Sequence, residues 1–354
     1  MRIFKKSLAA ILLLAGCSMV SAHDFTATVN GQKVYFNIKS KTNQTVEVTY
    51  NGSIADKRIS EVEGVLEIPA KVKHNNVVYS VTGVGAKSFA GATKLKSVVF
   101  PSSVKSIGDF AFEGCVSLES IVFPGNSVTP GQGVFFKCTS IKNVTLGSDW
   151  KSVDLAMFRW SDSLVSISIP AKTEKIQHLK TLKTLRNIDV DVNNAKFMSC
   201  DGVLYSIDGK TLYSCPRSYQ GSLKIKEGTE MVTKGAMIDC QQITQIDFPE
   251  SIKSFSFRET SRMKDLKAII IRGNTVPTTA YLNDEGKFLI QTANESLQIV
   301  VLNSQKKEFR TSLVQSSGEY TETKDANSTP YLVEVAQMPK TNNVVGVKNF
   351  SKYE

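Results

Sequence analysis

The sequence predicts a solenoid of short parallel strands, wound from repeats of about 23 residues. Two consecutive stretches support this prediction: residues 95–115, LKSVVFPSSVKSIGDFAFEGC, and residues 118–138, LESIVFPGNSVTPGQGVFFKC. Apolar residues, a proline and a closing Phe-x-x-Cys recur in both at the same offsets. Other columns extend the same spacing over further repeats, as in Leu95, Leu118, Ile141, Leu164 and in Phe89, Phe112, Phe135, Phe158. A fixed period in this range indicates units that bury their apolar faces only against their neighbours.

The first 22 residues predict a signal peptide, because MRIFKK is followed by the short apolar run LAAILLLAG, which is too short to span a membrane. Two processing sites overlap in it. Cys17 follows Leu-Ala-Gly, which resembles a bacterial lipobox and would make Cys17 a lipidated N-terminus. Val-Ser-Ala at 20–22 is a small-residue cleavage site that would release a chain beginning at His23, and the apolar SMVSA after Cys17 favours this second site. Both predict an exported protein, at the cell surface or outer membrane or secreted.

Residues 23–80 predict a β-rich N-terminal cap, since they contain short alternating strands and an Asn-Gly hairpin signal at 30–31. A solenoid needs such a cap because its first repeat would otherwise expose an apolar end.

The repeats are predicted over residues 81–277. Their period breaks once, near residues 200–215, where CDGVLYSIDGKTLYSCP adds 12 residues as two alternating strands around Asp208-Gly209, a favourable hairpin turn. The spacing of 23 then returns, which indicates one inserted hairpin within a continuous array. Residues 278–313 predict a C-terminal cap, and residues 314–354 a polar tail.

Composition and motifs favour no catalytic or nucleic-acid-binding class. The net charge of +10 is dispersed, with no block of five like charges and no helical reading motif. The three histidines, His23, His74 and His178, stand beside no nucleophile signature, and neither C-x-x-C, H-x-x-x-H nor a glycine-rich phosphate loop occurs. We therefore expect no enzyme activity, no cofactor and no metal site.

Each cysteine and tryptophan could either pack in the core or take part in function. Three cysteines share one repeat column and are expected to pack as small apolar core residues: Cys115, Cys138 and Cys240. Cys200 and Cys215 flank the hairpin, and the sequence leaves open whether they form a disulfide. A hairpin turn at 208–209 would place the two cysteines two positions out of register. Trp150 and Trp160 are expected to pack half-buried; a glycan platform would require both to be exposed on one edge.

The repeat pattern resembles the BspA-like, or treponemal, class of leucine-rich repeats over roughly residues 23–310. The resemblance rests on two motifs. The strand motif has a leucine, two further apolar residues and a proline, here Leu118, Ile121, Phe123 and Pro124. The other motif is Ile-Gly, Ala-Phe and Cys, which lies just before this strand as Ile107, Gly108, Ala111, Phe112 and Cys115. Non-proline residues stand at three expected proline positions (Asp191, Lys226, Arg272), and residues 172–183 lack the Ala-Phe pair. The family implies an α/β solenoid with a parallel concave sheet, and its characterised members are described as surface adhesins.

Strand alternation predicts a candidate binding surface on that concave sheet. If Val98 and Phe100 point into the core, Val99 points outward. The same position in all eight repeats gives one outward column: Val99, Val122, Thr145, Ser168, Asp189, Lys224, Asp247, Ile270. With strands ~4.8 Å apart the ladder covers about 540 Å², less than the roughly 800 Å² that each partner buries in a stable protein complex. It therefore suits a peptide or glycan chain, or a protein that also grips the loops.

The sequence thus predicts a non-catalytic recognition module, acting in cell adhesion or protein binding, with a protein or glycan ligand at the cell surface. The alternative is an envelope-anchored accessory lipoprotein that binds a partner of the same cell and touches the membrane only through lipid on Cys17. Neither hypothesis includes a nucleic-acid partner.

Overall fold

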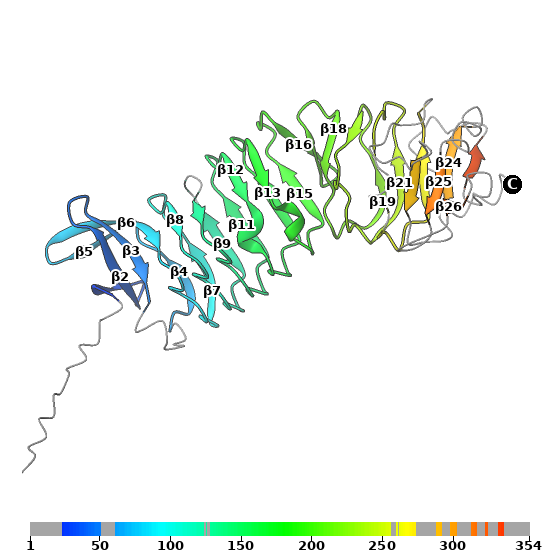
Figure 1. Ribbon diagram of the computed structural model, residues 1–354. Helices are drawn as coiled ribbons and strands as arrows, with labels where there is room; N and C mark the ends of the chain where they lie inside the picture. The colour runs from blue at the N-terminus through cyan, green and yellow to red at the C-terminus, as the bar shows by residue number, and fades with distance from the viewer. Residues whose placement is uncertain are drawn as a thin grey trace, which may run out of the picture.

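The structure is a computed structural model. It describes residues 23–50, 61–123, 125, 128–255, 260 and 262–273, and the backbone of five short strands between residues 288 and 335. The strands stack as successive rungs of one elongated solenoid (Figure 1). The predicted signal peptide, including Cys17, lies outside the described residues.

One long series of parallel strands runs through the solenoid in two blocks, and the hydrogen-bonded ladder of the first block is interrupted between β11 and β13. The first block consists of β4 (Gly64–Glu67), β7 (Leu95–Val99), β9 (Ser120–Phe123), β11 (Asn143–Leu146), β13 (Ser166–Ile169) and β15 (Asn187–Val190). The second block consists of β19 (Gly221–Lys224), β21 (Ile243–Phe248), β22 (Ala268–Ile271), β24 (Gln298–Leu302) and β27 (Leu332–Val335). The sequence prediction of a solenoid with 23-residue spacing and parallel strands is confirmed.

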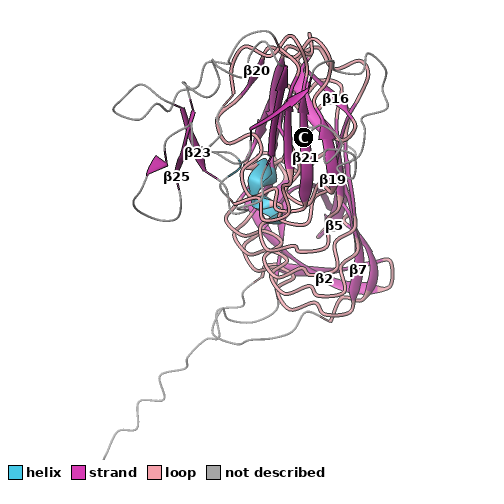
Figure 2. Cartoon of the chain, turned by 90° about the vertical axis from the view of Figure 1, so that its right-hand side faces the viewer, coloured by secondary structure: helices cyan, strands magenta, loops and turns pink. Residues whose placement is uncertain are grey.

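A second ladder of shorter parallel strands lines another side of the coil. It contains β6 (Val77–Val84), β8 (Ser106–Ile107) and β10 (Thr129–Pro130), then β12 (Ser152–Asp154) with β14 (Lys175–Gln177), and β18 (Thr211–Ser214) with β20 (Met231–Val232). The two 3₁₀ helices, η1 (Leu155–Phe158) and η2 (Leu179–Thr181), lie on the other side of the coil from β7 and β19 (Figure 2).

The N-terminal end is closed by a small sheet. β1 (Phe25–Val29), β2 (Gln32–Ser40) and β3 (Thr45–Thr49) pair antiparallel in sequence order, and β5 (Lys71–His74) pairs antiparallel with β6. β3 pairs parallel with β6, which joins this sheet to the short ladder. β4 belongs to the long ladder, so the first rung begins at Gly64, inside the segment assigned to the cap from sequence.

The inserted segment forms a three-stranded meander between the two blocks. β16 (Phe197–Cys200) pairs antiparallel with β17 (Val203–Ser206), and β17 with β18. Near the C-terminal end, β23 (Phe288–Gln291) pairs parallel with β25 (Leu313–Ser316), which pairs antiparallel with β26 (Thr323–Lys324).

Identical positions of successive repeats stack in the core. Ring centroids in the series Phe89, Phe112, Phe135, Phe158 lie 5.1, 5.2 and 5.3 Å apart. Offset stacking at this separation is favourable beyond the apolar area that it buries. The three cysteines of the repeat column are fully buried, as the sequence predicts; Cys115 and Cys138 belong to the same core as this stack.

The buried thiols also act as hydrogen-bond donors between rungs. The Cys115 thiol donates to the Phe89 carbonyl (3.2 Å) and the Cys138 thiol to the Phe112 carbonyl (3.0 Å). At the next position of the column the Ser161 hydroxyl donates to the Phe135 carbonyl (3.3 Å). Cysteine and serine at these three positions each donate to a carbonyl of the preceding rung, whereas Ala92, one repeat earlier in the same column, is buried without a side-chain donor.

The apolar core is divided at β17. Leu204 belongs to the cluster that extends back to Phe25, whereas Val203 and Tyr205 belong to a second cluster that extends to Ile271. Alternate side chains of a strand point to opposite faces. β17 is therefore a wall between two cores.

Candidate ligand-binding face

The outward column predicted from sequence forms in-register runs within each block. Val99, Val122 and Thr145 are paired in β7, β9 and β11, and Ser168 is paired with Asp189. Lys224, Asp247 and Ile270 are paired in the second block. The meander separates Asp189 from Lys224, so the column consists of at least two parts.

The second part differs from the expectation of a solvent-facing column. Asp247 and Ile270 are only 2% and 3% exposed. Gln245 and Ala268, which face the same way two residues earlier in the same strands, are also buried. The predicted surface therefore does not continue over β21 and β22.

Burial of Asp247 is compensated by the guanidinium of Arg272, the residue that follows β22. Arg272 Nε and Nη2 donate to the two carboxylate oxygens of Asp247 at 2.7 Å each. The carboxylate raises the pKa of Arg272 further above its ordinary value. A bidentate pair satisfies both oxygens, which makes a buried charge tolerable. These two residues hold the fold and are not available to a ligand.

A second outward column, which the sequence reasoning missed, accompanies the first in the N-terminal block. Residues two positions earlier in each strand face the same side. They are Ser97, Ser120, Asn143, Ser166 and Asn187, which are in register through β7, β9, β11 and, separately, β13 and β15. The signal was present, because these positions carry only hydroxyl and amide side chains. The first block therefore presents two adjacent columns, one uniformly polar and one grading from valine to aspartate. We call this surface the outward face.

Three residues of the outward face form a hydrogen-bonded cluster. Asn187 Nδ2 donates to Asp189 Oδ2 (2.7 Å) and to Ser166 Oγ (3.3 Å), and Ser166 Oγ lies 3.3 Å from the same Asp189 oxygen. Ser168 and Thr145 next to the cluster are exposed. The arrangement offers carboxylate, amide and hydroxyl groups on one face of a sheet, which suits hydrogen bonding to an extended polar chain.

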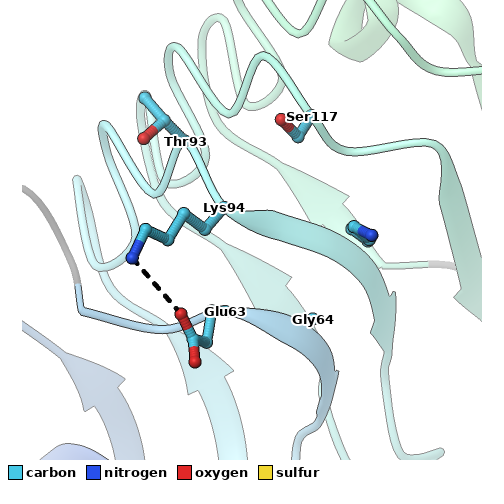
Figure 3. Close-up of a pocket in the computed structure, with 6 residues that line it drawn as sticks. Glu63, Gly64, Thr93, Lys94 and Ser117 are labelled. Atoms are coloured by element: carbon cyan, nitrogen blue, oxygen red, sulfur yellow. Dashed lines mark ion pairs between the residues drawn. The ribbon is translucent and has the colours of Figure 1, made fainter.

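A shallow hollow lies at the start of the same ladder (Figure 3). It has a volume of about 450 Å³ and is lined by Glu63, Gly64, Thr93, Lys94, Lys96 and Ser117. Lys94 Nζ and Glu63 Oε2 lie 3.5 Å apart across it, and both side chains are exposed. The side chains that line it are charged or carry a hydroxyl, so the hollow extends the polar surface at the start of the ladder.

The histidines are distributed over separate parts of the fold. The His23 ring packs on Tyr35, and burial lowers the pKa of His23, with Lys33 adding to the effect. The His74 ring stacks on Phe25, and His178 Nδ1 lies 2.8 Å from Asp154 Oδ1. Within the described ranges, the His178 ring forms no hydrogen bond with a hydroxyl or thiol. Within those ranges, no three His, Cys, Asp or Glu side chains gather as a metal site requires.

The remaining candidate residues take separate roles. Cys200 and Cys215 are free thiols, the first partly exposed and the second buried. Trp150 is fully buried against Phe123, with ring centroids 5.2 Å apart, whereas Trp160 is 43% exposed. The two tryptophans therefore do not share an exposed edge. Within the described part of the chain, no helix has the length and apolar character needed to cross a membrane.

Comparison with known proteins places the repeats in a recognised class. The family described as "BspA type Leucine rich repeat region" matches residues 70–181 and 191–284, in six copies. No curated protein matches the chain by sequence.

Similar solved structures include a leucine-rich cell surface protein from Faecalibacterium prausnitzii, at 20% identity over 79% of this chain and 89% of that one, with a TM-score of 0.38. They also include the pneumococcal vaccine antigen PcpA (17% identity, 82% and 97%, TM-score 0.41) and a leucine-rich repeat protein of Treponema pallidum (17% identity, 59% and 87%, TM-score 0.37).

Proposed function

Because the chain belongs to the BspA-type leucine-rich repeat family, we propose that it is an exported, non-catalytic recognition protein of the cell surface. Its ligand is an extended polar chain, a peptide or a glycan, which lies along the outward face. Repeat proteins offer extended surfaces of this kind, because side chains from successive rungs are held at fixed spacing.

The observation that carries the proposal is the pairing of two outward columns in the first block. Thr145 and Ser168 are exposed, and the cluster of Ser166, Asn187 and Asp189 holds its polar atoms in place before any ligand arrives. Preorganised groups lose less conformational entropy on binding than free side chains.

The second block does not share this role. Asp247 and Ile270 are buried, so the ligand contacts are assigned to Val99, Val122, Thr145, Ser168 and Asp189. The shorter face covers a smaller area than the eight-rung estimate, and this favours a chain-like ligand over a globular one.

A matched pair of substitutions tests the outward face. Thr145→Glu places a charge at its centre, and Thr139→Glu places the same charge on an exposed turn of the same repeat. The mature chain from residue 23 is screened on an oligosaccharide array and a peptide array. We expect a captured probe to bind wild type and Thr139→Glu alike and to bind Thr145→Glu at least about tenfold more weakly. Equal binding by both variants, or no capture on either array, would overturn the proposal.

Export is tested by the mass of the mature N-terminal peptide from native cells, together with membrane fractionation. A start at His23 in the secreted or soluble envelope fraction supports signal-peptidase cleavage. An acylated Cys17 supports the envelope-anchored alternative and directs the ligand search to neighbouring surface proteins. A chain that retains residues 1–22 in the cytosol would contradict export.

A further inference from the structure

Trp160 occupies a left-handed backbone conformation that glycine holds in two of the three preceding repeats. Its φ is +68°, and the same position holds Gly91 (φ +75°), Gly114 (φ +71°) and Lys137 (φ +59°) in the three preceding repeats. A bulky side chain is strained there, whereas glycine is not. Because the Trp160 ring is exposed although its backbone is strained, the residue is expected to have a role other than packing.

Two cations lie against the Trp160 ring. Lys183 Nζ is 4.5 Å and Arg159 Cζ 5.6 Å from a ring centroid of Trp160. One rung earlier, Lys137 Nζ lies 5.2 Å from the centroid of Phe136. The three cations are exposed, and we call these five residues the cationic aromatic edge.

The charges of this edge are not neutralised by carboxylates. Among the described residues, Lys137, Arg159 and Lys183 form no ion pair, and neither does Asp162, the acidic residue two positions after Trp160. Elsewhere on the solenoid, lysines pair with an acid 23 residues away, as in Lys142–Glu119, Lys172–Asp149 and Lys253–Glu230. Cation–π contacts hold these three side chains in position but leave their positive charge available.

We propose that the cationic aromatic edge binds an acidic polysaccharide. Its carboxylate groups pair with Lys137, Arg159 and Lys183, and the C–H face of a sugar ring packs against the exposed part of Trp160. Successive rungs of the solenoid are ~4.8 Å apart, which matches the order of length of one sugar unit in an extended chain. The charges therefore recur along the solenoid as they recur along a polyuronate.

A polysaccharide fits the edge better than an acidic peptide. The contacts are made by side chains of turns, and the edge offers no unpaired strand to which a peptide backbone could add. The edge is also distinct from the outward face, because its residues lie in the turns that precede β11, β13 and β15 and not in those strands.

Trp160→Gly is the decisive variant, because glycine already occupies the column and relieves the strain. The probe is polygalacturonate, and the same polymer with its carboxylates methyl-esterified is the neutral control. We expect wild type to bind the acid polymer and not the ester, and Trp160→Gly to bind at least about fivefold more weakly. The double variant Arg159→Gln, Lys183→Gln should lose as much, whereas Lys172→Gln, an exposed lysine outside the edge, should change binding less than twofold.

Several outcomes would overturn the proposal. They are unchanged binding by Trp160→Gly, equal binding of the esterified polymer, or equally tight binding of polyglutamate or of phosphatidylglycerol vesicles. Thr145→Glu keeps the two proposals separable, because it should bind polygalacturonate as wild type does even if it loses an array ligand.

Discussion

The carboxylate of Asp247 and the guanidinium of Arg272 are joined by two hydrogen bonds of 2.7 Å on the outward side of neighbouring strands, where both side chains are largely buried. Removing one partner leaves a buried charge without compensation. Arg272→Met should therefore lower the free energy of unfolding by about 3–5 kcal/mol, measured by chemical denaturation. The double variant Asp247→Leu, Arg272→Met should recover much of the loss, and a double variant no more stable than the single one would contradict this account.

Gln32 closes the free edge of the first rung. Its amide donates to the Val65 carbonyl (3.0 Å) and accepts from the Glu63 N–H (2.8 Å), so one side chain replaces a neighbouring strand. Gln32→Leu should cost about 1 kcal/mol and promote concentration-dependent association, since open edges template strand addition. Light scattering after size exclusion checks this, with Gln132→Leu, on an exposed turn, as control. Equal behaviour of the two variants would refute the edge-closing role.

The wall formed by β17 predicts two units of local stability. Leu204→Ala acts on the first core and Leu212→Ala, the same substitution on β18, acts on the second. Each should cost about 2–5 kcal/mol locally. Hydrogen exchange should accelerate in β13 and β15 for the first variant and in β21 and β22 for the second. Acceleration of all four strands by either variant would show one cooperative unit.

Glu230 predicts a small acid-dependent effect. Hydrogen bonds from Lys253 and Lys210 lower the pKa of Glu230 below its ordinary value of 4.5. A lowered folded-state pKa stabilises the fold above pH 4.5, and this stabilisation is lost as the pH falls through the folded value. Glu230→Gln should therefore lower Tm at pH 7 but not once wild-type Glu230 is protonated. Glu174→Gln, which removes an exposed carboxylate that forms no ion pair within the described residues, should leave Tm unchanged at both pH values, and a constant Glu230→Gln deficit would contradict the linkage.

The repeat period made the solenoid predictable because each apolar column occupies the same place in every rung. Strand alternation likewise placed Val99, Val122 and Thr145 side by side. Following one outward position per strand, however, left the second column, with Ser97 and Asn187, unnoticed. The two-residue strands of the short ladder, such as β8 and β10, were too short to be recognised as strands from the sequence.

Whether a side chain is exposed to solvent was harder to predict than the face of the sheet to which it points. Alternation states which way Asp247 and Ile270 point but not what covers them, and both are buried. Apolar Ala268 and Ile270 at outward positions were the available sign. Gln32 escaped notice for another reason, and Trp160 was considered only for packing or as part of a platform shared with Trp150. The contacts of Gln32 and Trp160 are with residues 33 and 23 positions away, which only the fold brings together.

The division of the core at β17 has a mechanical consequence. When a solenoid is pulled from its two ends, it is expected to yield by peeling one rung at a time. Each detached rung releases 23 residues, up to roughly 80 Å of chain. Because the meander separates two cores, a rupture that starts at one end is expected to stop at this wall, which would make the protein extensible in two stages and leave one block folded while the other takes up the load.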